Sequence, residues 1–152
     1  MQANRPRLYA MARENYGIEM NPGPFGFNSR PALIGAKYAE ASGQGPAYQH
    51  KVMYAYWEEA KDIEDREVLG DIATDIGLKR ESFLTALDDE TYQKQVLEDI
   101  ATARSYGLDA VPAMVFADQY LVSGAQPLEV LQQVIGRIIE LAAEDQGPDA
   151  AE

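Results

Sequence analysis

Few of the side chains that carry covalent chemistry are present in this chain. The 152 residues include no cysteine and a single histidine, His50. A thiolate nucleophile, a disulfide and a thiolate metal site are therefore excluded, and one histidine cannot form a multi-histidine metal set. Ser123 precedes a glycine, but no base lies beside it in the sequence and it is not in a nucleophile elbow. We assign no catalytic residue, metal site or cofactor from these residue types.

Two polar features deserve comparison with known kinds of site. Asp62, Glu64, Asp65 and Glu67 place four carboxylates within six residues, but their spacing is not that of a calcium loop. The pattern instead indicates the solvated start of a helix with Asp65 as its N-cap. His50 has no second histidine or cysteine near it, which indicates a surface or structural histidine rather than a ligand.

Aromatic residues gather in one segment, at a spacing that puts several of them on one helical face: Tyr48, Met53, Tyr54, Tyr56 and Trp57. Such a face is usually part of a hydrophobic core, and we predict core packing here. A ligand groove is the alternative reading of the same residues.

Composition limits the class of protein and its partners. Hydrophobic residues make up 46% and charged residues 25%, which is typical of an ordinary globular domain with one core. Lys and Arg number 13 against 25 Asp and Glu, so the net charge of −12 disfavours nucleic acid as a partner. No apolar run is long enough for a membrane span, and residues 1–6 do not resemble a secretory signal. We expect a cytoplasmic protein with no membrane partner.

The order of elements predicts a mainly α fold with a small β-hairpin. Proline, glycine and capping residues delimit helices over residues 6–16, 29–42, 47–60, 65–76, 82–87 and 88–106. Two short apolar runs, 113–116 and 120–123, form the hairpin candidate. Pro127 suits the first turn of a final helix with an apolar stripe. The acidic residues 145–152 are expected to be a disordered tail.

The hairpin region carries a family resemblance. The string Gly107-Leu-Asp-Ala-Val-Pro-Ala-Met-Val-Phe116, followed by Tyr120-Leu-Val-Ser-Gly-Ala-Gln-Pro127, resembles DsbA-family thioredoxin-like proteins, and within them the FrnE-like dithiol-disulfide isomerases. Upstream, Asn28-Ser-Arg-Pro-Ala32 and the segment through Val68-Leu69 resemble the helical insertion of that family. The likeness covers about residues 8–140.

The resemblance implies an organisation and an activity. Residues 1–107 would form the helical insertion region, and residues 108–144 the C-terminal β-β-α half of a thioredoxin-like (α/β) fold. The family acts as thiol-disulfide oxidoreductases and isomerases, with a strand, a Cys-x-x-Cys helix and a second strand that have no counterpart here. The chain is therefore expected to be an N-terminally truncated, catalytically inactive member, because thiol-disulfide exchange needs sulfur.

The same resemblance names the only candidate site residues, Val111 and Pro112. In the family this prolyl bond is cis, and the residue before it presents main-chain groups to an extended protein or peptide substrate. The strand after it would have an unpaired apolar edge here, so we expect self-association as a homodimer. Two other functions stay open. One is a relative of 2-hydroxychromene-2-carboxylate isomerases or kappa-class glutathione transferases, and the other is a non-enzymatic binding or assembly module.

Overall fold

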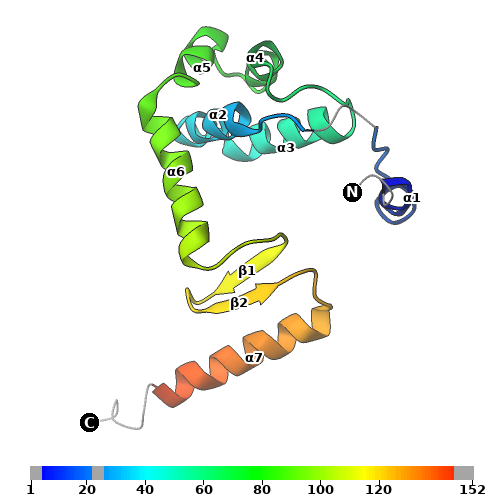
Figure 1. Ribbon diagram of the computed structural model, residues 1–152, viewed down its shortest axis with the longest axis vertical. Helices are drawn as coiled ribbons and strands as arrows, with labels where there is room; N and C mark the ends of the chain where they lie inside the picture. The colour runs from blue at the N-terminus through cyan, green and yellow to red at the C-terminus, as the bar shows by residue number, and fades with distance from the viewer. Residues whose placement is uncertain (1–4, 22–25, 146–152) are drawn as a thin grey trace. The chain divides into compact units, whose positions relative to one another are not determined.

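The computed structural model describes residues 5–21 and 26–145 (Figure 1). The tail expected over 145–152 lies outside them except for Asp145, which ends the last helix. The described elements, in chain order, are α1 (Arg5–Tyr16), α2 (Arg30–Ala41), α3 (Gly45–Trp57), α4 (Arg66–Asp75), α5 (Arg80–Ala86), α6 (Glu90–Ser105), β1 (Ala113–Phe116), β2 (Tyr120–Ser123) and α7 (Leu128–Asp145). The predicted fold class, mainly α with one small hairpin, is confirmed.

The chain packs as two compact units, Met1–Asp99 and Ile100–Glu152, and the boundary between them falls within α6. The first is the helical unit and the second is the hairpin unit. The division that the resemblance places after Gly107 concerns family organisation and stays a prediction. No helix in the described ranges has the length and apolarity needed to cross a bilayer.

A cluster of aromatic rings lies at the centre of the core of the helical unit. Tyr48 of α3 and Phe83 of α5 are fully buried, and their ring centroids lie 5.5 Å apart. Tyr38 of α2 contacts Phe83 edge-on at 5.9 Å, and Tyr92 of α6 at 5.7 Å. Edge-to-face pairs at these distances are favourable beyond the area they bury. They therefore hold α2, α3, α5 and α6 around one centre.

The prediction that the whole aromatic segment belongs to the core is wrong for part of it. Tyr48, Val52 and Ala55 are buried, at positions that share one face of α3. Met53 and Tyr54 lie off that face, with exposed fractions of 52% and 41%. A helix that packs along one side buries only one stripe, so aromatic residues at neighbouring positions cannot all be inside.

Short polar contacts set where the helices begin and how they are joined. Asp65 accepts a hydrogen bond from the Glu67 main-chain N–H at 2.9 Å, which confirms it as the N-cap of α4. Arg66 forms a bidentate salt bridge with Asp88, in which both N–O distances are 2.7 Å. That contact ties the start of α4 to the residues after α5. The hydrogen bond from Arg66 is the main reason that the pKa of Asp88 is lowered.

The hairpin unit, unlike the helical unit, has no buried residue among those described from 100 to 144. β1 and β2 pair antiparallel, with Ala113 opposite Ser123 and Phe116 opposite Tyr120. The predicted strand limits are confirmed. Not one residue between 100 and 144 is buried, although α7 is strongly amphipathic. This unit therefore has elements and an apolar face but no core among its described residues.

Candidate binding site at the hairpin

The approach to the hairpin is set by the end of α6. Gly107 adopts a positive φ of 69°, and its N–H donates to the Arg104 carbonyl at 3.0 Å. The Leu108 N–H donates to the Ala103 carbonyl at 3.0 Å, which completes a glycine C-cap of the Schellman type. Only glycine takes this backbone conformation without a steric penalty, so the sequence signal for the helix end has a direct physical cause. The chain then runs free of helix and strand until β1.

Val111 and Pro112 lie at the entrance to β1. The peptide bond between them is cis. The Pro112 carbonyl accepts a hydrogen bond from the Gly124 N–H at 2.8 Å, which extends the β1–β2 ladder by one rung. Pro112 is thus fixed to the hairpin by its main chain, and it positions the residue before it.

Val111 is the most exposed large apolar residue of the described chain, with 92% of its surface open to solvent. Its main-chain N–H and C=O make no hydrogen bond to any described residue. An apolar side chain beside two free main-chain groups is the combination that an extended peptide can bind by strand addition. That Val111 and Pro112 bind a substrate, as the resemblance implies, stays a prediction.

The outer edge of β1 continues this set of free groups. In an antiparallel pair, hydrogen-bonded residue pairs alternate with non-hydrogen-bonded ones. Because Pro112 and Gly124 form a hydrogen-bonded pair, Met114 and Phe116 direct their main-chain groups to β2. Those of Ala113 and Val115 therefore point to the other side, where the described residues provide no strand. The resemblance did not single out these two residues, although the two-residue period of a strand could have found them.

The turn of the hairpin is held by an unusual pair of residues. Ala117 and Asp118 both have positive φ, 50° and 56°, which a tight turn between twisted strands favours but a β-carbon resists. The Tyr106 hydroxyl donates a hydrogen bond to Asp118 Oδ1 at 3.2 Å. That carboxylate raises the pKa of Tyr106. The contact connects the residue after α6 to the far end of the hairpin.

Of the other residues considered from the sequence, Ser123 lies at the end of β2 opposite Ala113, and the rest belong to the helical unit. His50 is exposed on α3, in the helical unit. The carboxylates near the start of α4 have structural contacts. Asp62 accepts from the Glu64 N–H at 2.8 Å, and Glu64 accepts from the Asn28 N–H at 3.1 Å. Glu67 pairs with Arg80 at 2.7 Å.

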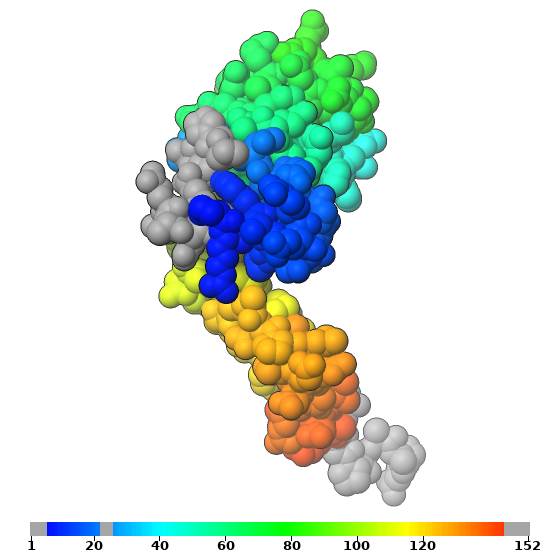
Figure 2. Space-filling model, turned by 90° about the vertical axis from the view of Figure 1, so that its right-hand side faces the viewer, coloured from blue at the N-terminus to red at the C-terminus, as the bar shows by residue number. Residues whose placement is uncertain are grey.

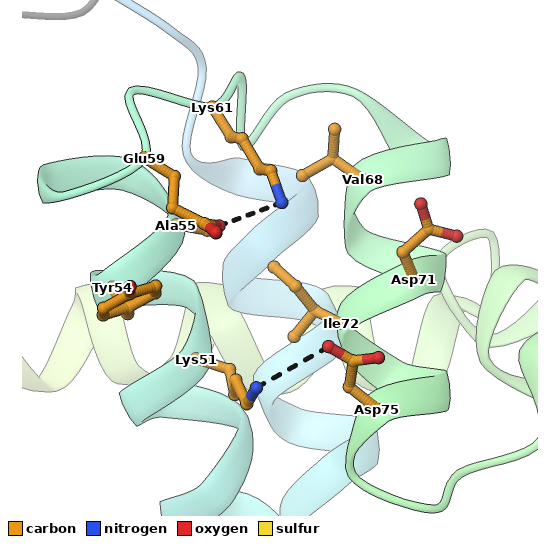
Figure 3. A pocket seen from close by; sticks show the side chains of 9 residues that line it. All are labelled: Lys51, Tyr54, Ala55, Glu59, Lys61, Val68, Asp71, Ile72 and Asp75. Carbon is orange, nitrogen blue, oxygen red and sulfur yellow. Dashed lines mark ion pairs between the residues drawn. The ribbon is translucent and has the colours of Figure 1, made fainter.

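A small groove lies between α3 and α4 (Figure 3). Ala55, Val68 and Ile72 form its apolar floor, and lysines and carboxylates form its walls. These charges are already matched within the protein. Lys51 pairs with Asp75 at 3.6 Å, and Lys61 with Glu59 at 2.9 Å, where the hydrogen bond raises the pKa of Lys61. Because these charged groups already pair with each other, few of them are available to bind a ligand, and the hairpin is the stronger candidate site.

Comparisons with known proteins agree with this geometry. The family model for the DSBA-like thioredoxin domain matches residues 7–136. The uncharacterized protein YwbO of Bacillus subtilis is 28% identical over 128 residues, which cover 80% of this chain and 62% of YwbO. The chain thus spans about three fifths of the length of that relative.

Two solved structures share the fold. A 2-hydroxychromene-2-carboxylate isomerase superposes with a TM-score of 0.73 at 26% identity, over 92% of this chain and 68% of that one. A candidate protein disulfide isomerase from Nitrosomonas europaea gives a TM-score of 0.68 at 18% identity, over 93% and 76% of the two chains. Because the family model covers most of the sequence, and the hairpin and its preceding Val-Pro lie within the match, this chain belongs to the DSBA-like thioredoxin domain family.

Proposed function

We propose that this chain acts in protein thiol-disulfide exchange of the DsbA type by binding extended polypeptide at Val111 and Pro112, while supplying no thiol of its own. The observation that carries the proposal is the exposed Val111 with unpaired main-chain groups at the head of an open strand edge. A polypeptide strand can satisfy those groups with its own N–H and C=O, whatever its sequence. This mode suits a protein that handles many unfolded chains.

The lack of sulfur limits what the chain does after binding. Exchange proceeds by thiolate attack on a disulfide and resolution of a mixed disulfide, and both steps need a thiol. The sequence contains none. We expect no insulin reduction and no oxidation of reduced ribonuclease above background by the pure protein. Turnover that follows the protein through purification would contradict this part of the proposal.

Binding is tested with a fluorescently labelled, reduced and carboxymethylated polypeptide, followed by anisotropy. The change Val111→Asp places a charge beside the free main-chain groups, and we expect it to weaken binding by about tenfold or more. The matched control is Leu33→Asp, which puts the same charge on an exposed leucine in the first turn of α2. Equal affinity of both variants and the original chain would reject Val111 as part of the site.

A second function is supported by one observation. The 2-hydroxychromene-2-carboxylate isomerase matches at 26% identity over nearly the whole chain, which supports the alternative of a relative of these isomerases or of kappa-class glutathione transferases. We propose glutathione binding as the property that separates this reading from the first. Titration calorimetry with reduced glutathione that shows a saturable isotherm, together with no polypeptide binding, would favour the isomerase reading.

A further inference from the structure

The segment between Tyr106 and Pro112 is held to the hairpin at both ends but not in between. At its far end, the Pro112 carbonyl accepts a hydrogen bond from the Gly124 N–H at 2.8 Å. At its near end, the Tyr106 hydroxyl donates to Asp118 Oδ1 at 3.2 Å. No hydrogen bond or ion pair joins residues 109–111 to another described residue. The conformation of this segment therefore depends on where its two ends are fixed.

The two contacts lie at opposite ends of the hairpin. Pro112 precedes β1, whereas Asp118 lies in the turn that follows it. A strand of four residues is about 13 Å long, so the two contacts hold the segment over the full length of β1. Figure 1 shows the same course, because the chain leaves α6 beside the turn and returns to the start of β1. Without the Tyr106 contact, only Pro112 would hold the segment to the hairpin.

The chemistry of the contact suits a fixed attachment point. Asp118 accepts no other hydrogen bond from a described residue, and its main chain has a left-handed φ of 56°. Aspartate adopts this conformation more readily than most residues, because its short polar side chain can bond locally. The carboxylate raises the pKa of Tyr106, so the phenol stays protonated and able to donate well above neutral pH.

We propose that Tyr106 is a positioning residue for the binding site, and that its hydrogen bond to Asp118 holds Val111 in the orientation that binds an extended polypeptide. The inference rests on the proposed function, because it concerns the same site. Val111 is 92% exposed and makes no hydrogen bond to a described residue, so its orientation has to come from the segment that carries it. Figure 2 shows atoms of this region, in yellow, at the molecular surface.

Anisotropy with the labelled, carboxymethylated polypeptide tests this role in four variants of the full chain. Tyr106→Phe removes only the hydroxyl, and Asp118→Gly removes the acceptor while it eases the left-handed turn. We expect each of these to weaken binding by about threefold to tenfold. Asp118→Asn keeps an acceptor oxygen, and Tyr120→Phe removes a hydroxyl that forms no hydrogen bond with a described residue. Both should bind like the original chain.

A role in hairpin stability alone would give a different pattern. Glycine in place of Asp118 favours the turn, so stability by itself predicts equal or tighter binding by Asp118→Gly. The phenol gives a second readout, because Asp118→Asn removes the charge that raises the pKa of Tyr106. In a ¹³C NMR titration of labelled tyrosine, we expect the Tyr106 pKa to fall in that variant. The loss of one signal in Tyr106→Phe assigns the resonance.

Unchanged binding by Tyr106→Phe would overturn the proposal, and so would an equal loss of binding in Tyr120→Phe. If the original chain binds no polypeptide, the proposed function fails, and ¹⁵N relaxation of residues 108–111 then decides the positioning role separately. Order parameters that fall in Tyr106→Phe, but not in Tyr120→Phe, would support that role. Order parameters that are unchanged in both variants would reject it.

Discussion

At Gly35, in the helical unit, the surrounding side chains leave no space for a β-carbon. Gly35 lies within α2, against the rings of Tyr48 and Phe83. A β-carbon built at this position would lie 2.7 Å from Phe83 Cζ, closer than side chains approach in folded proteins, and it would also meet the Tyr48 hydroxyl. Both rings are fully buried and cannot move aside without disturbing the core. The glycine is therefore required by packing and not by its backbone angles.

We expect Gly35→Ala to destabilise the protein by about 1–3 kcal/mol, because overpacking outweighs the gain in helix propensity. Gly136→Ala is the control. Gly136 also lies within a helix, α7, but a β-carbon there meets nothing within 4 Å. That change should stabilise by about 0.5–1 kcal/mol. Urea unfolding followed by circular dichroism measures both, and the same sign for the two variants would contradict the packing argument.

In the hairpin turn, the positive φ of Ala117 lowers the stability of the hairpin. Alanine at a left-handed φ costs roughly 1–2 kcal/mol, while glycine in place of alanine costs up to about 1 kcal/mol in chain entropy. The first cost is larger, so we expect Ala117→Gly to strengthen the hairpin. The amides of Met114 and Phe116, which face β2, should exchange more slowly with solvent. Ala113→Gly, in the strand itself, should have the opposite effect.

Elements differ in how completely their faces are covered. The helices α2 to α5 each bury residues against one another in the helical unit. The last helix, α7, is strongly amphipathic, yet its described apolar residues stay half-buried or exposed. A helix of this kind gains most of its stability from packing of its apolar face.

Ile139→Glu tests whether α7 takes part in the self-association that the sequence leads us to expect. We expect it to weaken the dimer by at least about tenfold, because it places a charge in the middle of an apolar contact. Gln133→Glu adds the same charge on another face of α7 and should leave the association nearly unchanged. Sedimentation gives both dissociation constants. If the two variants weaken association equally, the effect is one of net charge, and α7 is not part of the interface.

The whole molecule carries a net charge of −12, so two copies repel each other at a distance. This repulsion is screened by salt, and the screening length falls from about 30 Å at 0.01 M to about 8 Å at 0.15 M. The strand expected to take part in self-association, β1, is apolar and uncharged, so a contact through it should not itself weaken with salt. Dimerisation should therefore become several-fold tighter as sodium chloride is raised between these concentrations. A dimer that dissociates on addition of salt would instead be held by ion pairs.

The sequence alone determined the features that depend on local physics. Helix ends follow from Gly107 and Asp65, whose backbone freedom and capping oxygen act over a few residues. The two strands follow from short apolar runs with a turn between them, and the lack of sulfur chemistry follows from composition. The family also followed from local strings, because the residues around Val111 and Pro112 are close together in the chain.

Only the tertiary structure decided which faces are covered. Tyr48 and Tyr54 look alike in the sequence, but α3 packs through one stripe, so the first is buried and the second is exposed. The register of β1 on β2 decided that Ala113 and Val115, rather than Met114, present free groups outward. The exposure of Leu128, Ile135 and Ile139 on α7 had no local signal either, because the sequence pattern of an amphipathic helix does not show whether its apolar face is covered. Burial is a property of what lies opposite a residue, and that is set by segments distant in the chain.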